Sequence, residues 1–197
     1  MAEKRSSLRT QQREFTRARF IDAGLEVFAE VGFHRATIDM ITERAGANRS
    51  TFYLHFKDKT SLMLAAHERM GPERKATIGM INAMDDPDLE EFRAWMGRLA
   101  ADWERDRRLY EAVMQAQLTE PSITKKNYEV VCEELSGYLS RFEGRQREAA
   151  EYRVMMFLMQ FEMYFYTTIC ESGEEPSPKA LDALAELGLY ALFNKTG

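Results

Sequence analysis

Apolar residues recur at intervals of three and four along almost the whole 197-residue chain, which is the spacing of one face of an α-helix. No segment shows the sustained polar–apolar alternation of a half-buried strand. The five prolines all lie from Pro72 onward, where they separate helical segments. These patterns predict an all-α fold of about nine helices, with no internal repeat and no long linker.

Capping residues and glycines predict the boundaries of the first helices. A helix over residues 13–31 would end at Gly32, because glycine readily adopts the left-handed conformation that terminates helices. Thr37 is a suitable N-cap for a short helix that stops at Gly46. Asn48 is a suitable N-cap for a second short helix directly after the turn.

Start signals for later helices follow the same rules. Asp58 can cap a longer helix, and further helices are expected to start at Asp86-Pro87, Pro121-Ser122 and Ser177-Pro178. The most apolar helix is expected over about residues 146–171. Its longest apolar-rich run, residues 154–170, contains two polar side chains and is shorter than the about 20 apolar residues that a membrane span needs. We therefore expect no membrane segment.

The charge of the chain is unevenly distributed. The net charge is −5, but residues 1–60 hold 11 basic and 8 acidic side chains, whereas residues 61–197 hold 16 and 24. A basic segment on an acidic body indicates a polyanionic partner. The charged N-terminus is not a secretory signal, and Cys132 and Cys170 are too few for a disulfide framework. These features predict a cytoplasmic protein.

Residues 37–56 have the pattern of a helix-turn-helix, which projects its second helix into the major groove of DNA. The turn Gly46-Ala47-Asn48 is short, and Phe52 and Phe56 share one face of the second helix, which must be the core side. The opposite face then carries side chains of the types that contact guanine edges and phosphates. It comprises Arg49, Ser50, Thr51, Tyr53 and Leu54.

The run Thr51-Phe52-Tyr53-Leu54-His55-Phe56-Lys57-Asp58-Lys59 is highly characteristic. Together with earlier residues it resembles the DNA-binding domain of the TetR family (tetracycline-repressor-like) of bacterial transcriptional regulators. The earlier matches, with one later one, are Ala23-Gly24-Leu25, Phe28-Ala29, Gly32-Phe33, Thr37, Ile41, Arg44-Ala45-Gly46 and Leu62. The resemblance covers about a third of the chain. It implies a DNA-binding domain over residues 13–73 and a helical ligand-binding and dimerisation domain over residues 74–197.

The resemblance also implies which residues contact DNA. Thr37 would donate its hydroxyl to a phosphate. Residues 48–51 would face bases or backbone, with Arg49 the best candidate for a bidentate guanine contact. Tyr53, His55 and Lys59 would contact phosphates. The expected DNA-contacting set is Thr37, Asn48, Arg49, Ser50, Thr51, Tyr53, His55 and Lys59.

Some positions depart from the family pattern or allow a second interpretation. Asn48 and Ala47 stand where the family commonly has Ser and Val, and Met40 where an acidic residue is frequent, which affects sequence preference rather than fold. His55, considered alone, is more typical of a helix-end histidine than of a phosphate ligand. The arginines near the N-terminus could reach a minor groove, although an unstructured solvated tail is the expected state. They are Arg5, Arg9 and Arg13.

The resemblance implies that the second domain dimerises through its last two long helices and holds an effector pocket. Residues 154–170 are apolar nearly all round, and the last helix carries an apolar stripe, so both could join a four-helix bundle with a second copy. The alternative is that both helices complete the core of one subunit. The stripe consists of Leu181, Leu184, Ala185, Gly188 and Leu192. Large, adaptable side chains are the candidate pocket lining, with ordinary core packing as the more common role for any single one of them. They are Trp95, Trp103, Tyr110, Met114, Met159, Glu162 and Met163.

Glu162 needs a partner, because an unpaired buried carboxylate is costly. It could pair with an arginine across a dimer interface, reach solvent or complement a cationic ligand. Cys170 is expected to be a buried, inert thiol, with a redox sensor as the alternative.

No catalytic, metal or cofactor site is expected. The three histidines lack metal-ligand spacing, and there is no Gly-x-Ser-x-Gly elbow or phosphate-binding glycine loop. We expect a homodimeric regulator, most consistent with a repressor that binds a palindromic double-stranded DNA operator and is released by a small-molecule inducer. The alternatives are a DNA-associated protein that acts through a protein partner, and a helical small-molecule-binding protein with no DNA role.

Overall fold

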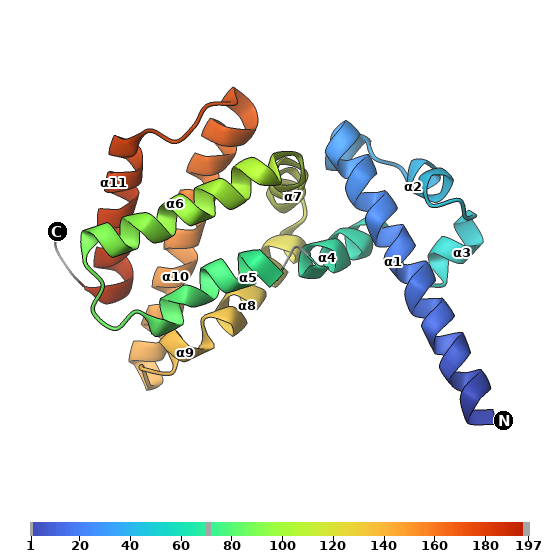
Figure 1. Cartoon of the computed structure of the whole chain (residues 1–197), viewed down its shortest axis with the longest axis horizontal. Coiled ribbons are helices and arrows are strands. Elements are labelled where there is room, and N and C mark those ends of the chain that lie inside the picture. The colour runs from blue at the N-terminus through green and yellow to red at the C-terminus, as the bar shows by residue number, and fades with distance from the viewer. Residues whose placement is uncertain (1, 70–71, 195–197) are drawn as a thin grey trace. The chain divides into compact units, whose positions relative to one another are not determined.

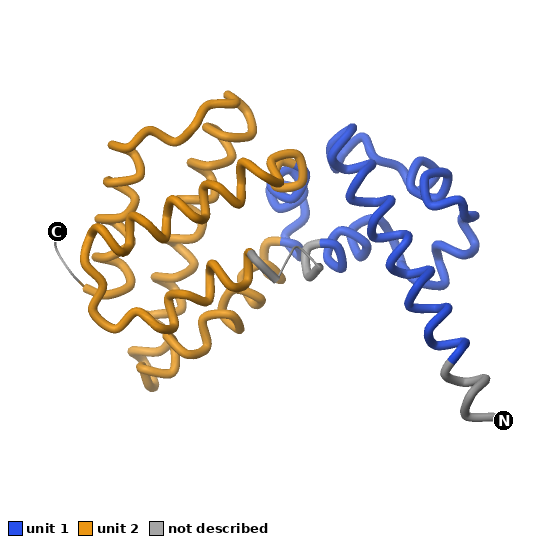
Figure 2. The backbone as a smooth tube through the Cα atoms, in the orientation of Figure 1, with its two compact units in different colours: residues 1–69, 112–123 blue, residues 70–111, 124–197 orange. Residues whose placement is uncertain are grey.

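The computed structural model describes residues 2–69 and 72–194, with side chains described at 8–66 and 74–194. Over these residues the chain is built of helices and contains no strand, which confirms the predicted all-α class (Figure 1). The chain divides into two compact units (Figure 2). Unit 1 comprises Met1–Arg69 and Ala112–Ile123, and unit 2 comprises Met70–Glu111 and Thr124–Gly197.

Unit 1 contains the four helices that the N-terminal sequence predicts. They are α1 (Ala2–Arg35), α2 (Ile38–Arg44), α3 (Arg49–Tyr53) and α4 (Lys59–Arg69). α1 packs against both α2 and α4. The core of this unit is rich in fully buried aromatic and aliphatic side chains, which include Phe20, Phe28, Phe33, Ile41, Phe52, Leu62 and Met63.

The predicted caps of the short helices are confirmed. The Met40 amide donates to Thr37 Oγ1 at 3.2 Å, and the Thr51 amide donates to Asn48 Oδ1 at 2.8 Å. Asp58 Oδ1 accepts from the amide of Ser61 at 2.7 Å, so α4 also has its expected cap. A side-chain acceptor at each N-terminus satisfies an amide that the helix itself leaves unpaired.

The start of α1 differs from the expectation. The helix begins at Ala2 instead of Arg13, so the predicted unstructured tail is wrong for Arg9 and Arg13, while the side chain of Arg5 lies outside the described side chains. Extension of an existing helix adds a hydrogen bond per residue without a new nucleation cost, and the segment contains no proline or glycine. Gly32 interrupts the helix as predicted, because its φ is +77°.

Unit 2 is formed by the later helices. α6 and α11 make a large contact, and α10 packs against α9, α11 and the terminal turn η3. α7 and α8 have residues in both units, because Ala112–Ile123 group with unit 1. The elements are α5 (Pro72–Gly79), η1 (Met80–Ala83), α6 (Leu89–Arg105), α7 (Arg107–Thr119), α8 (Pro121–Glu134), α9 (Ser136–Leu139), α10 (Gly144–Phe165), η2 (Tyr166–Ser172), α11 (Pro178–Gly188) and η3 (Leu189–Phe193).

The boundaries in unit 2 agree with the sequence in part. α11 starts as expected, with Ser177 Oγ accepting from the amide of Ala180 at 3.2 Å. α6 starts later than expected, because Asp88, and not Asp86, accepts from a first-turn amide. The segment after Pro121 is two helices, α8 and α9, instead of one, and α5 was not anticipated. The described residues therefore hold 11 α-helices, of which nine have at least seven residues; the total is close to the expected nine, although α5 is additional and the predicted α3 has five residues.

The apolar stripe of the last helix lies mainly in the core of unit 2. Leu184, Ala185, Gly188 and Leu192 are buried within this unit. A Cβ added to Gly188 would lie 2.3 Å from the ring of Phe92 on α6, so the glycine allows a close approach of helices inside one subunit. These four residues therefore fit the alternative in which the last helix completes the core of one subunit.

The predicted domain boundary, between residues 73 and 74, lies close to the division of the two units at Arg69 and Met70. The sequence did not indicate that residues 112–123 group with the N-terminal unit. No helix in the described parts of the chain is long and apolar enough to cross a membrane.

Candidate nucleic-acid interface

α2 and α3 form a helix-turn-helix whose inner side is aromatic. The ring of Phe20 on α1 lies 5.4 Å from that of Phe52 and 6.4 Å from that of Phe56, both in edge-on geometry, and all three side chains are buried. This arrangement anchors one face of α3 against α1. It confirms the predicted core face of the second helix.

The turn between α2 and α3 is held by backbone contacts. Gly46 has a φ of +60°, which favours glycine, and the Ala47 amide donates to the Thr42 carbonyl at 2.9 Å. Arg19 of α1 donates to the carbonyl of Ala45. These contacts fix the angle at which α3 leaves the turn.

The outer side of α3 is exposed and largely polar. Arg49, Ser50 and Tyr53 are exposed, whereas Thr51 is half-buried. Leu54, directly after α3, is the most exposed large apolar side chain among those that the structure describes. The outer face that the spacing predicts is therefore presented to solvent, as a DNA-reading helix requires.

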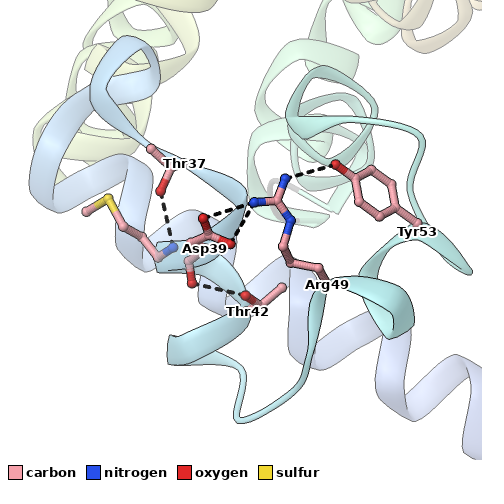
Figure 3. A network of polar contacts seen from close by, with 6 residues as sticks. Thr37, Asp39, Thr42, Arg49 and Tyr53 are labelled. Carbon is pink, nitrogen blue, oxygen red and sulfur yellow. Dashed lines mark hydrogen bonds and ion pairs between the residues drawn. The ribbon is translucent and has the colours of Figure 1, made fainter.

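Arg49 is held by partners on two helices, as Figure 3 shows. Its Nη1 lies 3.0 Å from both carboxylate oxygens of Asp39 on α2, and its Nη2 donates to the Tyr53 hydroxyl at 3.4 Å. The hydrogen bond to the Tyr53 hydroxyl, and then the charge of the Asp39 carboxylate, raise the pKa of Arg49, so its guanidinium is fully charged. The sequence analysis did not identify Asp39, although an acidic residue in the first turn of a helix is a common stabilising feature.

Two of the predicted DNA-contacting residues also have local roles. Asn48 Oδ1 accepts from both the amide and the hydroxyl of Thr51, at 2.8 and 3.0 Å. Thr37 Oγ1 accepts from an amide of α2, which leaves the hydroxyl proton able to point elsewhere. These caps set the position of each helix start, and the DNA contacts stay predictions.

Lys59 has a different environment from that of a phosphate-binding lysine. Its Nζ lies 2.8, 3.2 and 3.2 Å from the carbonyls of Phe33, His34 and Ala36, so its three N–H donors have acceptors at the end of α1. The ammonium also lies 4.6 Å from the centre of the Phe33 ring. The geometry therefore gives Lys59 a role at the C-terminus of α1, and its phosphate contact stays a prediction.

His55 is half-buried beside the aromatic core. Among the described residues its Nδ1 is buried and has no hydrogen-bond partner. Burial, and then the positive charges of Arg13 and Arg17, lower the pKa of His55, so the imidazole is neutral at pH 7. A phosphate contact by this residue would use one N–H of a neutral ring and stays a prediction.

The structure brings some of the predicted ligand residues together: the rings of Trp103 and Tyr110 stack with centroids 4.3 Å apart, and Glu162 is an electrostatic neighbour of Tyr110. Trp95, Trp103, Tyr110, Met114 and Glu162 are buried, whereas Met159 and Met163 are 57% and 42% exposed. Trp95 is the only predicted residue that lines an apolar cavity in unit 2, which has room for about one water-sized molecule. The other lining residues, which the sequence analysis missed, are Ile78, Ile81, Val131, Leu135, Val154, Phe157, Leu158, Phe161 and Leu192. The helical spacing of apolar residues predicts which side chains are buried. It does not predict which of these buried side chains border a cavity.

Glu162 is the end of a buried polar chain inside unit 2. Asn127 of α8 donates to Glu162 Oε1 at 3.2 Å, and Arg74 of α5 donates to Asn127 Oδ1 at 3.2 Å. Arg74 Nη1 lies 3.7 Å from Glu134 Oε1. Burial raises the pKa of Glu162 to about 7, although Arg74 and Asn127 oppose the shift. Within the described chain, Glu162 is thus partnered by an asparagine of its own subunit.

Cys170 is buried, and its Sγ lies 3.5 Å from the carbonyl oxygen of Arg107. Burial is the main cause of a raised pKa of about 12, which keeps the thiol protonated and unreactive. This supports the expectation of an inert thiol. Over the described residues, no group of three or more His, Cys, Asp or Glu side chains could hold a metal ion.

The fold and the exposed face of α3 define an all-helical protein with an N-terminal helix-turn-helix of the DNA-binding type. Residues 20–66 match the family described as "Bacterial regulatory proteins, tetR family". The chain belongs to this family. The family and the relatives below are regulators of transcription and not enzymes.

Two regulators of Pseudomonas putida are among the similar proteins. The chain is 34% identical over 94 residues to the HTH-type transcriptional regulator SrpR, a match that covers 40% of this chain and 44% of SrpR. It is 34% identical over 92 residues to the uncharacterized HTH-type transcriptional regulator TtgW, a match that covers 39% of this chain and 69% of TtgW. The match to SrpR thus spans less than half the length of that relative.

A solved structure shares the whole fold. The transcriptional regulator FadR from Bacillus subtilis, in complex with stearoyl-CoA, superposes with a TM-score of 0.54 and 21% identity, over 89% of this chain and 97% of that one. This similarity extends the family fold to the residues beyond the helix-turn-helix.

Proposed function

We propose that the protein is a homodimeric, ligand-responsive transcriptional regulator, and specifically a repressor that binds a palindromic operator and is released by a small-molecule inducer. The observation that carries the proposal is the outer face of α3. It presents Arg49, Ser50 and Tyr53 to solvent while Phe52 and Phe56 anchor its inner face. A short helix held in this way can enter a major groove without rearrangement of the core.

Dimerisation is supported by an apolar stripe on the outer face of α10, which we call the α10 stripe. It consists of Tyr152, Met156, Met159 and Met163, all of which are exposed. The intervals of four, three and four residues place them on one side of the helix. Leu187 of α11 and Tyr190 of η3 are also exposed. Exposed apolar clusters on neighbouring helices are typical of an interface, and a second copy of this chain is the proposed partner.

The effector is proposed to occupy the apolar cavity of unit 2. Its lining is aliphatic and aromatic, so the chemistry favours an apolar or amphiphilic molecule. Because the cavity has room for only about one water-sized molecule, a larger effector requires the surrounding helices to move apart. Such a ligand-dependent displacement is what a coupling between effector and DNA binding needs, and the coupling must be reciprocal.

The test is selection of duplexes from a random pool by the full chain, followed by affinity measurements over a salt series. The proposal expects a palindromic consensus bound about 10³-fold or more above scrambled DNA, with an affinity that falls as salt rises. Arg49→Ala should lower operator affinity by about 10-fold to 100-fold, and Tyr53→Phe by less. Salt-insensitive, micromolar binding to every duplex would contradict the proposed function.

A further inference from the structure

Arg49, the expected base-reading residue, is attached to the other helix of the helix-turn-helix. The two carboxylate oxygens of Asp39 both lie 3.0 Å from its Nη1, and the Tyr53 hydroxyl accepts from its Nη2 at 3.4 Å (Figure 3). Arg49 and Tyr53 are one turn apart on α3, whereas Asp39 lies in the first turn of α2. The guanidinium is therefore held between two helices.

Asp39 is itself fixed in place. The neighbouring Met40 amide donates to the Thr37 hydroxyl oxygen at 3.2 Å, and the hydroxyl of Thr42 donates to the Asp39 carbonyl at 3.0 Å. Both contacts are drawn in Figure 3. These contacts fix the backbone of the first turn of α2, from which the exposed Asp39 carboxylate reaches Arg49.

The contact with Asp39 uses a single nitrogen of the guanidinium. Arginine reads guanine with two parallel N–H groups, and its planar fork offers such a pair on the edge formed by Nε and Nη2. The carboxylate on Nη1 leaves that edge directed away from Asp39. The Tyr53 contact at 3.4 Å is long, so a base can replace it.

Asp39 also cancels the charge of Arg49 as seen by distant phosphates. Both side chains are exposed, at 56% for Arg49 and 65% for Asp39, so the pair is presented to the DNA as a nearly neutral unit. A free arginine on this face would bind any phosphate backbone. An arginine held by a carboxylate loses that attraction but keeps its hydrogen-bond donors.

We propose that Asp39 is a positioning residue for sequence recognition: it orients Arg49 for base contact and suppresses its attraction to non-specific DNA. The inference rests on the proposed function, because it requires that α3 reads DNA. It predicts an unusual result, namely that removal of an acidic side chain improves DNA binding in general while it impairs discrimination.

The experiment compares the affinity of the full chain for its selected operator with that for a scrambled duplex, at several salt concentrations. Asp39→Asn has the same shape without the charge. We expect its affinity for scrambled DNA to rise, its salt dependence to steepen by about one counterion, and its operator-over-scrambled ratio to fall about fivefold or more.

The matched control is Glu43→Gln, which removes an equal charge from α2. Glu43 lies in the last turn of α2 and lines a surface groove with Arg19 and Arg44. The operator-over-scrambled affinity ratio of Glu43→Gln should stay within about twofold of that of the unchanged chain, even though its net charge changes by the same amount as in Asp39→Asn. A double-mutant cycle with Arg49→Gln completes the design, because Asp39→Asn should have no further effect on the ratio once Arg49 is absent.

Three outcomes would overturn the inference. They are an unchanged ratio in Asp39→Asn, an equal loss in Glu43→Gln, and a loss that persists in the Arg49→Gln background. Circular dichroism checks the fold of each variant, and Asp39→Ala repeats the measurement if Asp39→Asn is not folded. Absence of salt-dependent DNA binding in the unchanged chain is a separate result, which would refute the proposed function itself.

Discussion

Two basic side chains of unit 1 form their polar contacts with other residues of the same unit. Lys59 lies against three carbonyls at the end of α1, and Arg44 forms ion pairs with Glu26 and Glu30 at 3.0 and 2.7 Å. Both are basic residues among those that carry the family resemblance. A basic residue that carries the resemblance can therefore stabilise the fold of unit 1 instead of contacting DNA.

Lys59→Met tests this assignment. Loss of the ammonium leaves the carbonyls of Phe33 and Ala36 without their donor, so we expect unit 1 to lose about 1–2 kcal/mol of stability. The measurement is urea unfolding followed by far-UV circular dichroism. Lys57→Met, at an exposed site in the same segment, is the control and should change stability by less than about 0.5 kcal/mol. Equal stability of the two variants would contradict the capping role.

The protonation of Glu162 predicts how the stability of unit 2 depends on pH. Its pKa rises from an ordinary value of 4.5 to about 7 on folding, so the folded state binds the proton more tightly than the unfolded state. The free energy of unfolding should therefore fall as pH rises from about 4.5 to about 7, by up to roughly 3 kcal/mol, and then level off.

Glu162→Gln should remove this dependence, because the amide oxygen can still accept from Asn127 and does not ionise. Tryptophan fluorescence reports on the right part of the chain, since Trp95 and Trp103 both lie in unit 2. Glu148→Gln, at an exposed position of α10, should leave the profile as it is. The same pH profile in both variants would show that Glu162 is not the titrating group.

The last long helices show why the partner of an apolar face is hard to predict at the level of elements. Leu184, Ala185 and Gly188 of α11, expected to face a second copy, are buried, whereas Met159 and Met163 of α10, expected to line a pocket, are exposed. In both helices the apolar residues cover more than one side. Periodicity shows that a side is apolar, but not whether its neighbour belongs to the same subunit.

Gly188→Ala measures how closely α11 approaches α6. The added methyl would lie 2.3 Å from Phe92 Cε1 and 2.7 Å from the nearest atom of the Phe157 ring, so we expect a loss of about 1–3 kcal/mol. Gly97→Ala is the control, because no atom lies within 4 Å of the added carbon, and it should stabilise α6 by about 0.5–1 kcal/mol. Chemical unfolding followed by tryptophan fluorescence compares the two. Equal effects would mean that the helices can separate without cost.

At the scale of the whole molecule, the net charge of −5 gives little indication of DNA binding. Residues 1–60 carry a net charge of only +3, so electrostatic attraction alone cannot supply high affinity. If the helix-turn-helix units of two subunits bind one palindrome, binding of the first unit raises the effective concentration of the second unit at its half-site. Dimerisation should therefore matter more for operator affinity than any one phosphate contact.

Met159→Glu places a charge in the α10 stripe and should convert the proposed dimer to a monomer in sedimentation equilibrium, without loss of helicity. Affinity for the full palindrome should fall by about 100-fold or more, while affinity for a half-site stays within about threefold. Leu118→Glu introduces the same charge at another exposed apolar residue. It should preserve both the oligomeric state and the affinity for the full palindrome. A Met159→Glu protein that remains dimeric would exclude the α10 stripe as the interface.

The sequence by itself determined the helical class, the caps at Thr37, Asn48 and Asp58, and the buried and exposed faces of α3. These features depend on neighbours within a few residues, where helix geometry relates spacing directly to position. Only the tertiary structure decided that Lys59 caps α1 and that Asp39 holds Arg49, because those contacts join residues of different helices. It also decided which apolar residues surround the cavity of unit 2, since a gap depends on how side chains from several helices fit together.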